Sequence, residues 1–520
     1  MPSKKSQPWP FGSLPPVIPK HTLAFALIAP SAFADISYAP RTLPDHTYAG
    51  GWEHYVGGGV AAFDCNGDQL PELYAAGGEN PAQLMRNVTA GAGGDLAFTA
   101  DTPGALAVTG VIGAYPLDID GDSILDLAIL RNGPDLLMQG QGNCTFEPFT
   151  DLGFVSGDHW TTAFSATWET GNSLPTLAFG TYVDRSNPDG PFETCDATLL
   201  YRPNGQSYAP VTRLEPGFCA LSMLFTDWSR TGRADLRTSN DRHYYVRGGQ
   251  EQMWAMEDTP RLYAQDEGWQ PYMLWGMGIA SRDLNGDGYS DVYLTSMGDQ
   301  KFQYFDPALG GPAYRDATYE RGTTAHRPYT GGDGRPSTGW HAAFGDVNND
   351  GLDDIFVAKG NVEQMPGAAM DDPNNLLIQL PDGTFTERGL EAGISNLARS
   401  RGAALMDLNL DGLLDLAVVN RRAQMELYQN TSAPGNWLAV QITAAAPNTG
   451  SIGAHVELRT GDRVQTREIT VGGGHASGQA GLLHFGMGQN TMAEVRVILP
   501  NQSASDWQQV DANQIITLSH

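Results

Sequence analysis

The sequence predicts an all-β protein in which one four-stranded unit is repeated around a ring. A loop of acidic and amide side chains recurs at a spacing of about 57 residues, which lies in the range of propeller blades. Apolar, β-branched runs flank each loop, with no helical periodicity between them. Glycine (62 residues) and proline (33) are abundant, as in proteins of short strands and turns. We predict a seven-bladed β-propeller over residues 35–431 and a small β-domain over residues 436–520.

The most complete loop lies between two apolar runs, within residues 344–357. Oxygen groups at positions 1, 3, 5, 7 and 9, with glycine at position 6, are what Ca²⁺ requires. Gly351 is at position 6, and Val357 stands where an EF-hand would need a bidentate Glu. We therefore predict a calcium loop that joins two strands. Its ligands are Asp346, Asn348, Asp350, the backbone carbonyl of Leu352, and Asp354.

Four further loops keep these oxygen positions, so we predict four or five Ca²⁺ per chain. In each of them position 7 again contributes its backbone carbonyl. The predicted ligands are Asp64, Asn66, Asp68, Leu70 and Glu72; Asp118, Asp120, Asp122, Ile124 and Asp126; Asp283, Asn285, Asp287, Tyr289 and Asp291; and Asp407, Asn409, Asp411, Leu413 and Asp415.

Two repeats depart from the pattern. The loop at 227–235 has Ser229 and Thr231 at ligand positions and adds two arginines. The turn at 168–176 has no carboxylate at any ligand position. We expect both turns to be free of metal.

Each repeat follows the order strand, cation loop, strand, strand, hairpin, strand. The repeat at 346 shows it, because residues 375–379 lead through an Asp-Gly turn into a fourth strand. The last repeat lacks its fourth strand, and residues 35–39 precede the first repeat without a blade of their own. We expect residues 35–39 to supply the missing outer strand and leave no open edge.

The N-terminus resembles a secretory signal. Three lysines accompany an apolar stretch over residues 22–29 and a small-x-small site at residues 32–34. We predict a signal peptide over residues 1–34 and export to the periplasm or the extracellular space, with a disordered tail as the alternative. No apolar run reaches the roughly 20 residues that a transmembrane helix needs. A net charge of −28 disfavours nucleic acid as a partner.

Four cysteines in an oxidising compartment allow two disulfides in three connectivities. Cys195 and Cys219 fall on one face of neighbouring blades, and Cys65 and Cys144 fall on the other. This placement favours the pairs Cys195–Cys219 and Cys65–Cys144.

The region after residue 435 has alternating strands over residues 437–442, 453–458, 467–471 and 494–499, and no cation loop. It contains Asn436-Trp-Leu, Ser451-Ile-Gly-Ala-His-Val456, Gly472-Gly-Gly-His475 and Leu483-His-Phe-Gly-Met-Gly488. These motifs resemble an ASPIC/UnbV domain, and the cation loops resemble FG-GAP/VCBS repeats of integrin α-type propellers. The combination is similar to the cartilage acidic protein family, with bacterial-type members. The resemblance implies a secreted calcium-binding propeller but no agreed reaction.

Long loops should gather on the face opposite the cation loops, at residues 183–197, 239–252 and 359–374. Loops longer than about 12 residues are usually functional or disordered. Aromatic and basic residues precede the first strands on this face, which suits binding of a small molecule, sugar or peptide, although packing along the axis is the alternative. The candidates for ligand binding are Trp52, His54, Trp160, His243, Trp275, Trp340, His341 and Arg401.

Catalytic motifs are absent from the sequence: there is no Gly-x-Ser-x-Gly elbow, phosphate-binding glycine loop, His-Glu-x-x-His or paired Cys-x-x-Cys. We expect a binding module for an unknown protein, saccharide or small-molecule ligand, and no catalytic residue is identified. One alternative is an enzyme acting on a saccharide or other small molecule at the channel mouth. Another is an extracellular scaffold that docks a partner through its C-terminal domain.

Overall fold

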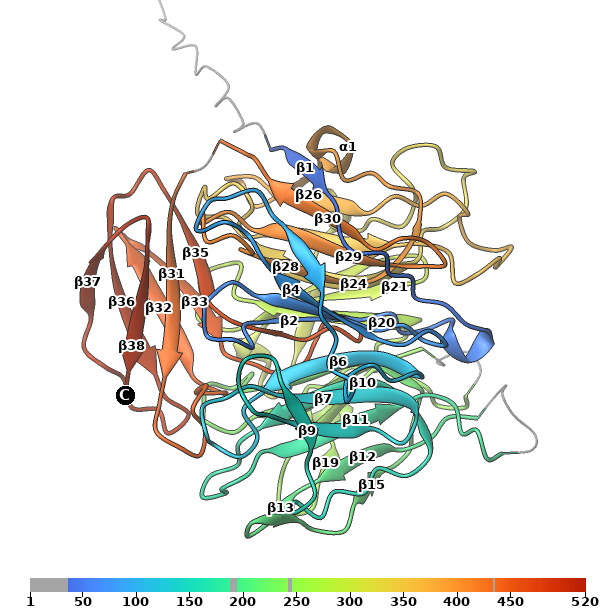
Figure 1. The fold of residues 1–520 in the computed structure, drawn as a ribbon. Helices are drawn as coiled ribbons and strands as arrows, with labels where there is room; N and C mark the ends of the chain where they lie inside the picture. Colours follow the sequence, from blue (N-terminus) through green and yellow to red (C-terminus); the bar gives the residue numbers. More distant parts are fainter. Residues whose placement is uncertain (1–35, 188–193, 242–245, 434) are drawn as a thin grey trace, which may run out of the picture. The chain divides into compact units, whose positions relative to one another are not determined.

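The computed structural model describes residues 36–187, 194–241, 246–433 and 435–520, and the regular elements among them are nearly all strands (Figure 1). The predicted signal peptide, residues 1–34, lies outside them. Within the described ranges no helix is long and apolar enough to cross a membrane. The helical segments are single turns: η1 (Trp52–His54), η2 (Gln265–Glu267), η3 (Pro307–Leu309), η4 (Tyr319–Arg321) and α1 (Gly389–Ala392).

Most strands of the described residues fall into antiparallel groups of four, which we call blades and number in chain order. Blades 1 to 3 contain β2 (Val60–Phe63), β3 (Glu72–Ala75), β4 (Gln83–Asn87) and β5 (Phe98–Ala100); β6 (Val111–Leu117), β7 (Asp126–Gly133), β8 (Leu136–Gly140) and β9 (Phe146–Pro148); and β10 (His159–Thr167), β11 (Thr176–Thr181), β12 (Thr198–Tyr201) and β15 (Thr212–Leu214). A small hairpin, β13 (Pro203–Asn204) and β14 (Ser207–Tyr208), projects from blade 3.

The remaining blades repeat this order. Blades 4 to 6 contain β16 (Ala220–Thr226), β17 (Asp235–Asn240), β18 (Gln252–Ala255) and β19 (Arg261–Leu262); β20 (Gly276–Arg282), β21 (Asp291–Ser296), β22 (Lys301–Phe305) and β23 (Tyr314–Asp316); and β24 (Gly339–Gly345), β25 (Asp354–Lys359), β26 (Asn375–Gln379) and β27 (Phe385–Glu387). Blade 7 contains β28 (Arg399–Met406), β29 (Asp415–Arg421), β30 (Glu426–Asn430) and β1 (Tyr38–Arg41).

The first strands of the blades contact one another in a closed circuit, from β2 through β6, β10, β16, β20 and β24 to β28 and back to β2. The predicted all-β class and its propeller-like architecture are confirmed. The exact number of blades stays a prediction, which the circuit supports. As expected, the N-terminal segment supplies the outer strand of blade 7, because β1 pairs antiparallel with β30 from Tyr38↔Asn430 to Arg41↔Leu427.

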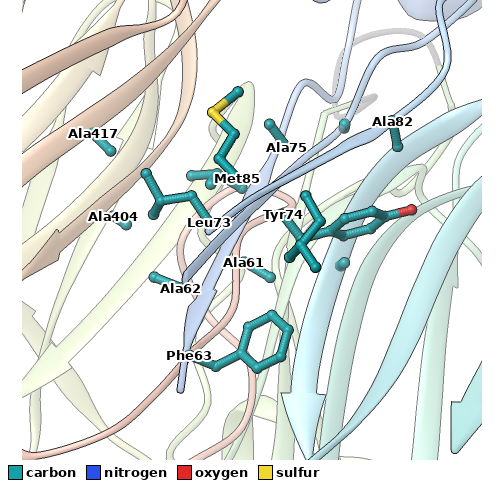
Figure 2. Close-up of a cluster of buried hydrophobic side chains, with 14 of the residues drawn as sticks. Ala61, Ala62, Phe63, Leu73, Tyr74, Ala75, Ala82, Met85, Ala404 and Ala417 are labelled. Carbon is teal, nitrogen blue, oxygen red and sulfur yellow. The ribbon is translucent and has the colours of Figure 1, made fainter. Parts of the chain in front are cut away.

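Hydrophobic layers fill the spaces between blades. In the layer around blade 1, Phe63, Leu73 and Met85 pack with Ala404 and Ala417 of blade 7 (Figure 2). All five side chains are almost completely buried. Because the alanines are small, the sheets of blades 1 and 7 can approach closely, and the larger residues of blade 1 fill the space between them.

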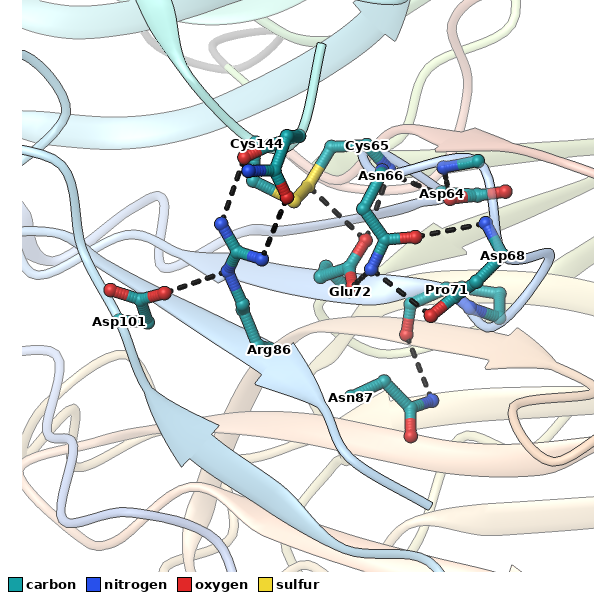
Figure 3. Close-up of a disulfide and its surroundings, with 12 residues drawn as sticks. Asp64, Cys65, Asn66, Asp68, Pro71, Glu72, Arg86, Asn87, Asp101 and Cys144 are labelled. Carbon is teal, nitrogen blue, oxygen red and sulfur yellow. Dashed lines mark hydrogen bonds and ion pairs between the residues drawn. A yellow bond between two sulfur atoms is a disulfide. The ribbon is translucent and has the colours of Figure 1, made fainter. Parts of the chain in front are cut away.

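Both predicted disulfides are present. Cys65 in the first cation loop is bonded to Cys144 in the β8–β9 turn (Figure 3). Arg86 reinforces the same junction, since its guanidinium donates to the carbonyl of Asn143 and pairs with Asp101. Cys195 is bonded to Cys219 and ties the long loop of blade 3 to the start of blade 4. Each bond therefore joins neighbouring blades.

The C-terminal region folds as two facing sheets whose strands share one apolar core around Leu438, Val456 and Phe485. The predicted third strand ends earlier than expected, at Glu468, because the chain then leaves the sheet. The boundaries 35–431 and 436–520 stay predictions. The strands of the region are β31 (Asn436–Thr443), β32 (His455–Thr460), β33 (Arg463–Glu468), β34 (Gln479–Ala480), β35 (Leu483–Gly488), β36 (Met492–Ile498), β37 (Gln508–Asp511) and β38 (Gln514–Ser519).

Candidate functional site

The predicted calcium loops at 118, 283, 346 and 407 share one backbone arrangement, which the loop at 346 illustrates. The carboxylate of Asp346 accepts hydrogen bonds from the amides of Asp350 (3.0 Å) and Gly351 (2.6 Å). Asp354 accepts from the amides of Val347 (3.0 Å) and Gln379 (2.9 Å), which fixes its side chain against the next strand. Asp415, Asp291 and Asp126 bond to the corresponding amides in their own loops.

These bonds hold the acidic side chains close together. In the loop at 118, carboxylate oxygens of Asp118, Asp120 and Asp126 all lie within 4.8 Å of one another. A single ion can bridge oxygens at this separation, and a donor set of carboxylates and a backbone carbonyl is that of a hard cation. The residues of the loop at 118 therefore fit Ca²⁺ by type and spacing.

In the same loops, burial makes it unfavourable for the carboxylates to carry a negative charge without a cation beside them. Burial raises the pKa of Asp126 and of Asp291 to about 8, and the pKa of Asp407 to about 7. The pKa of Asp354 is raised well above its usual range, first by burial and then by the nearby charge of Asp346. A bound cation would supply the positive charge that keeps these buried carboxylates ionised.

In the two departing repeats, arginine supplies this charge. In the loop at 227, Arg233 pairs with Asp235 at 3.1 Å, and Asp235 also accepts from the indole of Trp228 and the hydroxyl of Tyr263. In the turn at 168, Glu169 accepts from Thr176 and from Arg202 at 2.8 Å. The absence of a metal from both turns stays a prediction.

The C-terminal domain packs directly on the cation-loop face. Backbone amides of Gly435 and Gly488 donate to the carbonyls of Asn348 (3.0 Å) and Asn349 (2.9 Å). Arg467 forms a buried ion pair with Asp353 at 2.9 Å, and although burial opposes it, this pair and the charge of Arg282 lower the pKa of Asp353. The imidazole of His484 bonds to the carbonyl of Gly412 in the loop at 407. Docking of this domain thus uses the backbone of predicted calcium loops.

Residues 471–479, which we call the axis loop, run from the C-terminal domain along the first strands of the blades. Its three consecutive glycines, 472–474, have positive φ values of 134°, 73° and 58°, which permit the turn. A Cβ on Gly474 would lie 2.4 Å from the His341 ring, so the backbone passes too closely for a side chain. The loop touches every blade, through Val471 with Ala166, Gly473 with Met223, Gly474 with Ile279, His475 with His341, Ser477 with Val60, Gly478 with Ala114, and Gln479 with Leu405.

The axis loop corrects the expectation of an open channel mouth. Trp160, Trp340, His341 and Arg401 are at most 2% exposed, and His54 is 6% exposed. Trp275 is half-buried, and His243 lies outside the described residues. Of the predicted ligand-binding residues, Trp52 is exposed, at 42%. Most of these aromatic and basic residues therefore pack along the axis, as the alternative interpretation expects.

Contacts within the axis show how it is filled. The guanidinium of Arg401 lies 4.0 Å from the ring centroid of Trp340 and donates to the carbonyls of Tyr55 and Val362. Burial lowers the pKa of His341 to about 4, so its ring is neutral and its Nδ1 accepts the amide of His475 at 3.1 Å. The Gly472-Gly-Gly-His475 run was the sequence signal for this loop, since consecutive glycines indicate close backbone approach.

His341→Ala is therefore expected to destabilise the fold. The substitution removes the acceptor of the His475 amide and leaves a cavity at the axis, which together should cost about 2 kcal/mol. Thermal unfolding of the variant should show a lowered midpoint. An unchanged midpoint would mean that the axis loop does not depend on this contact.

The loop-rich face has its own hollow, at blade 3. A cavity of about 270 Å³ is lined by Asp158, His159, Asp184, Arg185, Ser186, Asp196 and Arg213. Asp196 accepts from His159 (2.8 Å) and from Arg213 (2.7 Å), and although burial opposes them, these bonds lower the pKa of Asp196 to about 2. The hydrogen bond to Asp196 also raises the pKa of His159. Sequence patterns did not single out this cavity, apart from the length of its loop.

Comparison with known proteins identifies a family domain in the C-terminal region. Residues 444–520 match the family model described as ASPIC and UnbV. Cartilage acidic protein 1 of Homo sapiens is 28% identical over 171 residues, which cover 31% of this chain and 23% of that protein, and the Mus musculus protein matches equally. The match thus spans less than a quarter of these relatives.

Among solved structures, BBS1N in complex with ARL6DN has a TM-score of 0.44 at 9% identity, covering 76% of this chain and 97% of that one. A lectin of Agrocybe aegerita that recognises non-reducing terminal N-acetylglucosamine has a TM-score of 0.40 at 14% identity, covering 72% and 94%. The FG-GAP/VCBS assignment of the repeats stays a prediction. The chain carries a C-terminal ASPIC/UnbV domain and is similar over part of its length to cartilage acidic protein 1.

Proposed function

We propose that this protein is an exported, calcium-binding β-propeller that acts as a binding module, with its ligand on the loop-rich face at blade 3. The observation that carries the site is the polar cavity of about 270 Å³ between the start of β10 and the loop that follows β11. The axis itself is filled by the chain's own residues. The cavity at blade 3 lies close to η1, which carries the exposed ring of Trp52.

The walls of the cavity are held in place by charged pairs. Arg185 donates to Asp158 (2.6 Å) and to Glu53 (3.1 Å), which connects the long loop to η1. Asp184 accepts from the amide of Ser186 at 2.9 Å. Hydrogen-bonding groups fixed in this way lose little conformational freedom when a ligand binds.

The chemistry of the cavity favours a saccharide. Both carboxylates and guanidinium groups line its wall, and such groups bind vicinal hydroxyls in pairs. Trp52, whose ring is 4.9 Å from that of Trp160, is exposed beside the wall, and an aromatic face packs against the C–H face of a pyranose. We therefore propose that the ligand is a terminal sugar residue of a glycan.

A glycan array followed by calorimetry with the best binding sugar tests this function. Asp184→Asn and Arg213→Gln should each weaken binding at least about tenfold, because each removes a charged hydrogen-bonding group. Asp95→Asn is the matched control, since Asp95 lines a separate hollow at residues 41–44 and 95–100. Equal affinity in all variants would exclude this cavity, and absence of binding to every glycan would exclude a saccharide ligand.

A further inference from the structure

Arg237 is a buried cation whose charge and hydrogen bonds are incompletely matched. It lies on β17 of blade 4 with an exposed fraction of 0%, and it reaches toward blade 5. Its Nη2 donates to Oε1 of Gln303 on β22 at 2.7 Å. Its Nε and Nη1 find no hydrogen-bond partner among the described residues. Buried polar groups are almost always hydrogen-bonded, so these two donors require an explanation.

Several acidic groups in this part of the molecule have partners of their own. Asp316 accepts from Gln303 and pairs with Lys301 at 2.9 Å. Asp235, two residues earlier on the same strand, pairs with Arg233. Glu468 accepts from Thr226 and from the amide of Asp227. Asp291 is a predicted calcium ligand, so its charge would be used in the loop at 283.

Two aromatic rings complete the surroundings. The Arg237 guanidinium lies 4.5 Å from the ring centroid of Tyr314 and 5.2 Å from that of Trp269. Burial raises the pKa of Tyr314 to about 12, although the charge of Arg237 and a side-chain hydrogen bond with it act in the opposite direction, so its phenol is neutral and brings no negative charge. The indole Nε1 of Trp269, which is 2% exposed, also finds no partner among the described residues.

The unmatched groups at this place are therefore donors, on an arginine and a tryptophan. A water molecule would accept hydrogen bonds from two of these donors, but its own hydrogens would then face further donors instead of acceptors. It would also leave the positive charge of Arg237 uncompensated. A small anion accepts from every donor and supplies the missing charge. Complete burial excludes a large or highly hydrated anion.

We propose that a chloride ion binds between blades 4 and 5, on the Nε and Nη1 groups of Arg237 and the indole N–H of Trp269. The ion joins β17 of blade 4 to the segment that precedes β20 of blade 5. It is a structural anion within an acidic protein, and it goes beyond the proposed calcium and ligand sites. The stability of the chain should then depend on the kind of anion in solution.

The first test compares thermal unfolding in chloride and in gluconate, at equal ionic strength and fixed calcium. Gluconate is too large for a buried site, so the midpoint should be about 2 °C higher in chloride, with saturation as chloride rises. Trp269→Phe keeps the ring and removes the N–H, so it should abolish most of this difference. Trp254→Phe is the matched control and should keep the full difference, because Trp254 is a buried tryptophan of blade 4 and the Arg237 guanidinium lies over the rings of Trp269 and Tyr314.

The second test is crystallographic. Crystals grown with bromide in place of chloride should give an anomalous peak within contact distance of the Arg237 guanidinium and the Trp269 nitrogen. The wild-type protein suffices for this experiment, so a failure of any variant to fold does not affect it. Equal midpoints in chloride and gluconate, or a bromide map without a peak there, would overturn the proposal and leave water as the occupant.

Discussion

Removal of calcium is expected to unfold most of the chain. Calcium at one hundred times the dissociation constant of a site stabilises the folded state by about 2.7 kcal/mol, so five such sites contribute about 13.5 kcal/mol, which equals the whole stability of many domains. Chelation would leave the carboxylates of each predicted calcium loop close together, with no cation to compensate their charge. The unfolding midpoint measured with excess chelator should therefore fall far below the midpoint in millimolar calcium.

Metal analysis after dialysis against calcium gives the decisive count, expected at four or five ions per chain. Asp350→Ala should lower that count by one, because Asp350 is a central ligand of the loop at 346. Two or fewer ions would contradict the assignment. Magnesium should restore little stability, since it demands a tighter octahedral geometry than these loops offer.

Gly486→Ala is expected to weaken both the C-terminal docking and one calcium site. A Cβ on Gly486 would lie 1.8 Å from Oδ2 of Asp346 and 2.9 Å from Cα of Asn349, so the methyl group has no room. Either β35 moves away from the loop or the first ligand of the loop turns aside. Overpacking of this kind costs about 3 kcal/mol.

Limited proteolysis and metal counting on this variant separate the two effects. Cleavage that releases the C-terminal domain should accelerate as the domain loosens, and one calcium ion should be lost or bound more weakly. Gly450→Ala serves as the control within the same domain, because the nearest atom to its Cβ is Cδ1 of Ile452 at 3.8 Å. If both variants behave like the parent protein, the domain does not depend on the loop at 346.

Features of the fold that follow from neighbouring residues or from the order of strands in the repeat could be predicted from the sequence. The spacing of Asp346, Asn348 and Asp350 specifies a turn whose carboxylates bond to its own amides. The cysteine pairs followed from the alternation of faces along each blade. Closure by residues near Tyr38 followed from counting strands.

Contacts between the axis loop and the blades could not be predicted in this way. Gly473 meets Met223, and Gly474 meets Ile279, across large distances in the chain, and no local pattern encodes these contacts. The aromatic and basic residues of the axis were therefore expected at an open channel mouth, although they contact the chain's own C-terminal loop. Arg237 likewise follows Asp235 and Leu236 in a pattern typical of an alternating, half-exposed strand.

The strand that completes blade 7 has a consequence for the order of folding. Tyr38 has to meet Asn430, so ring closure requires a contact between the two ends of the repeat array. Such non-local pairing slows folding, because the closure entropy is lost before the contact forms. Until then β30 presents an open edge, which can pair with another chain. During synthesis and the proposed export, the edge of β30 remains unpaired until the N-terminal segment pairs with it. Aggregation during biogenesis should therefore depend on how quickly β1 and β30 pair.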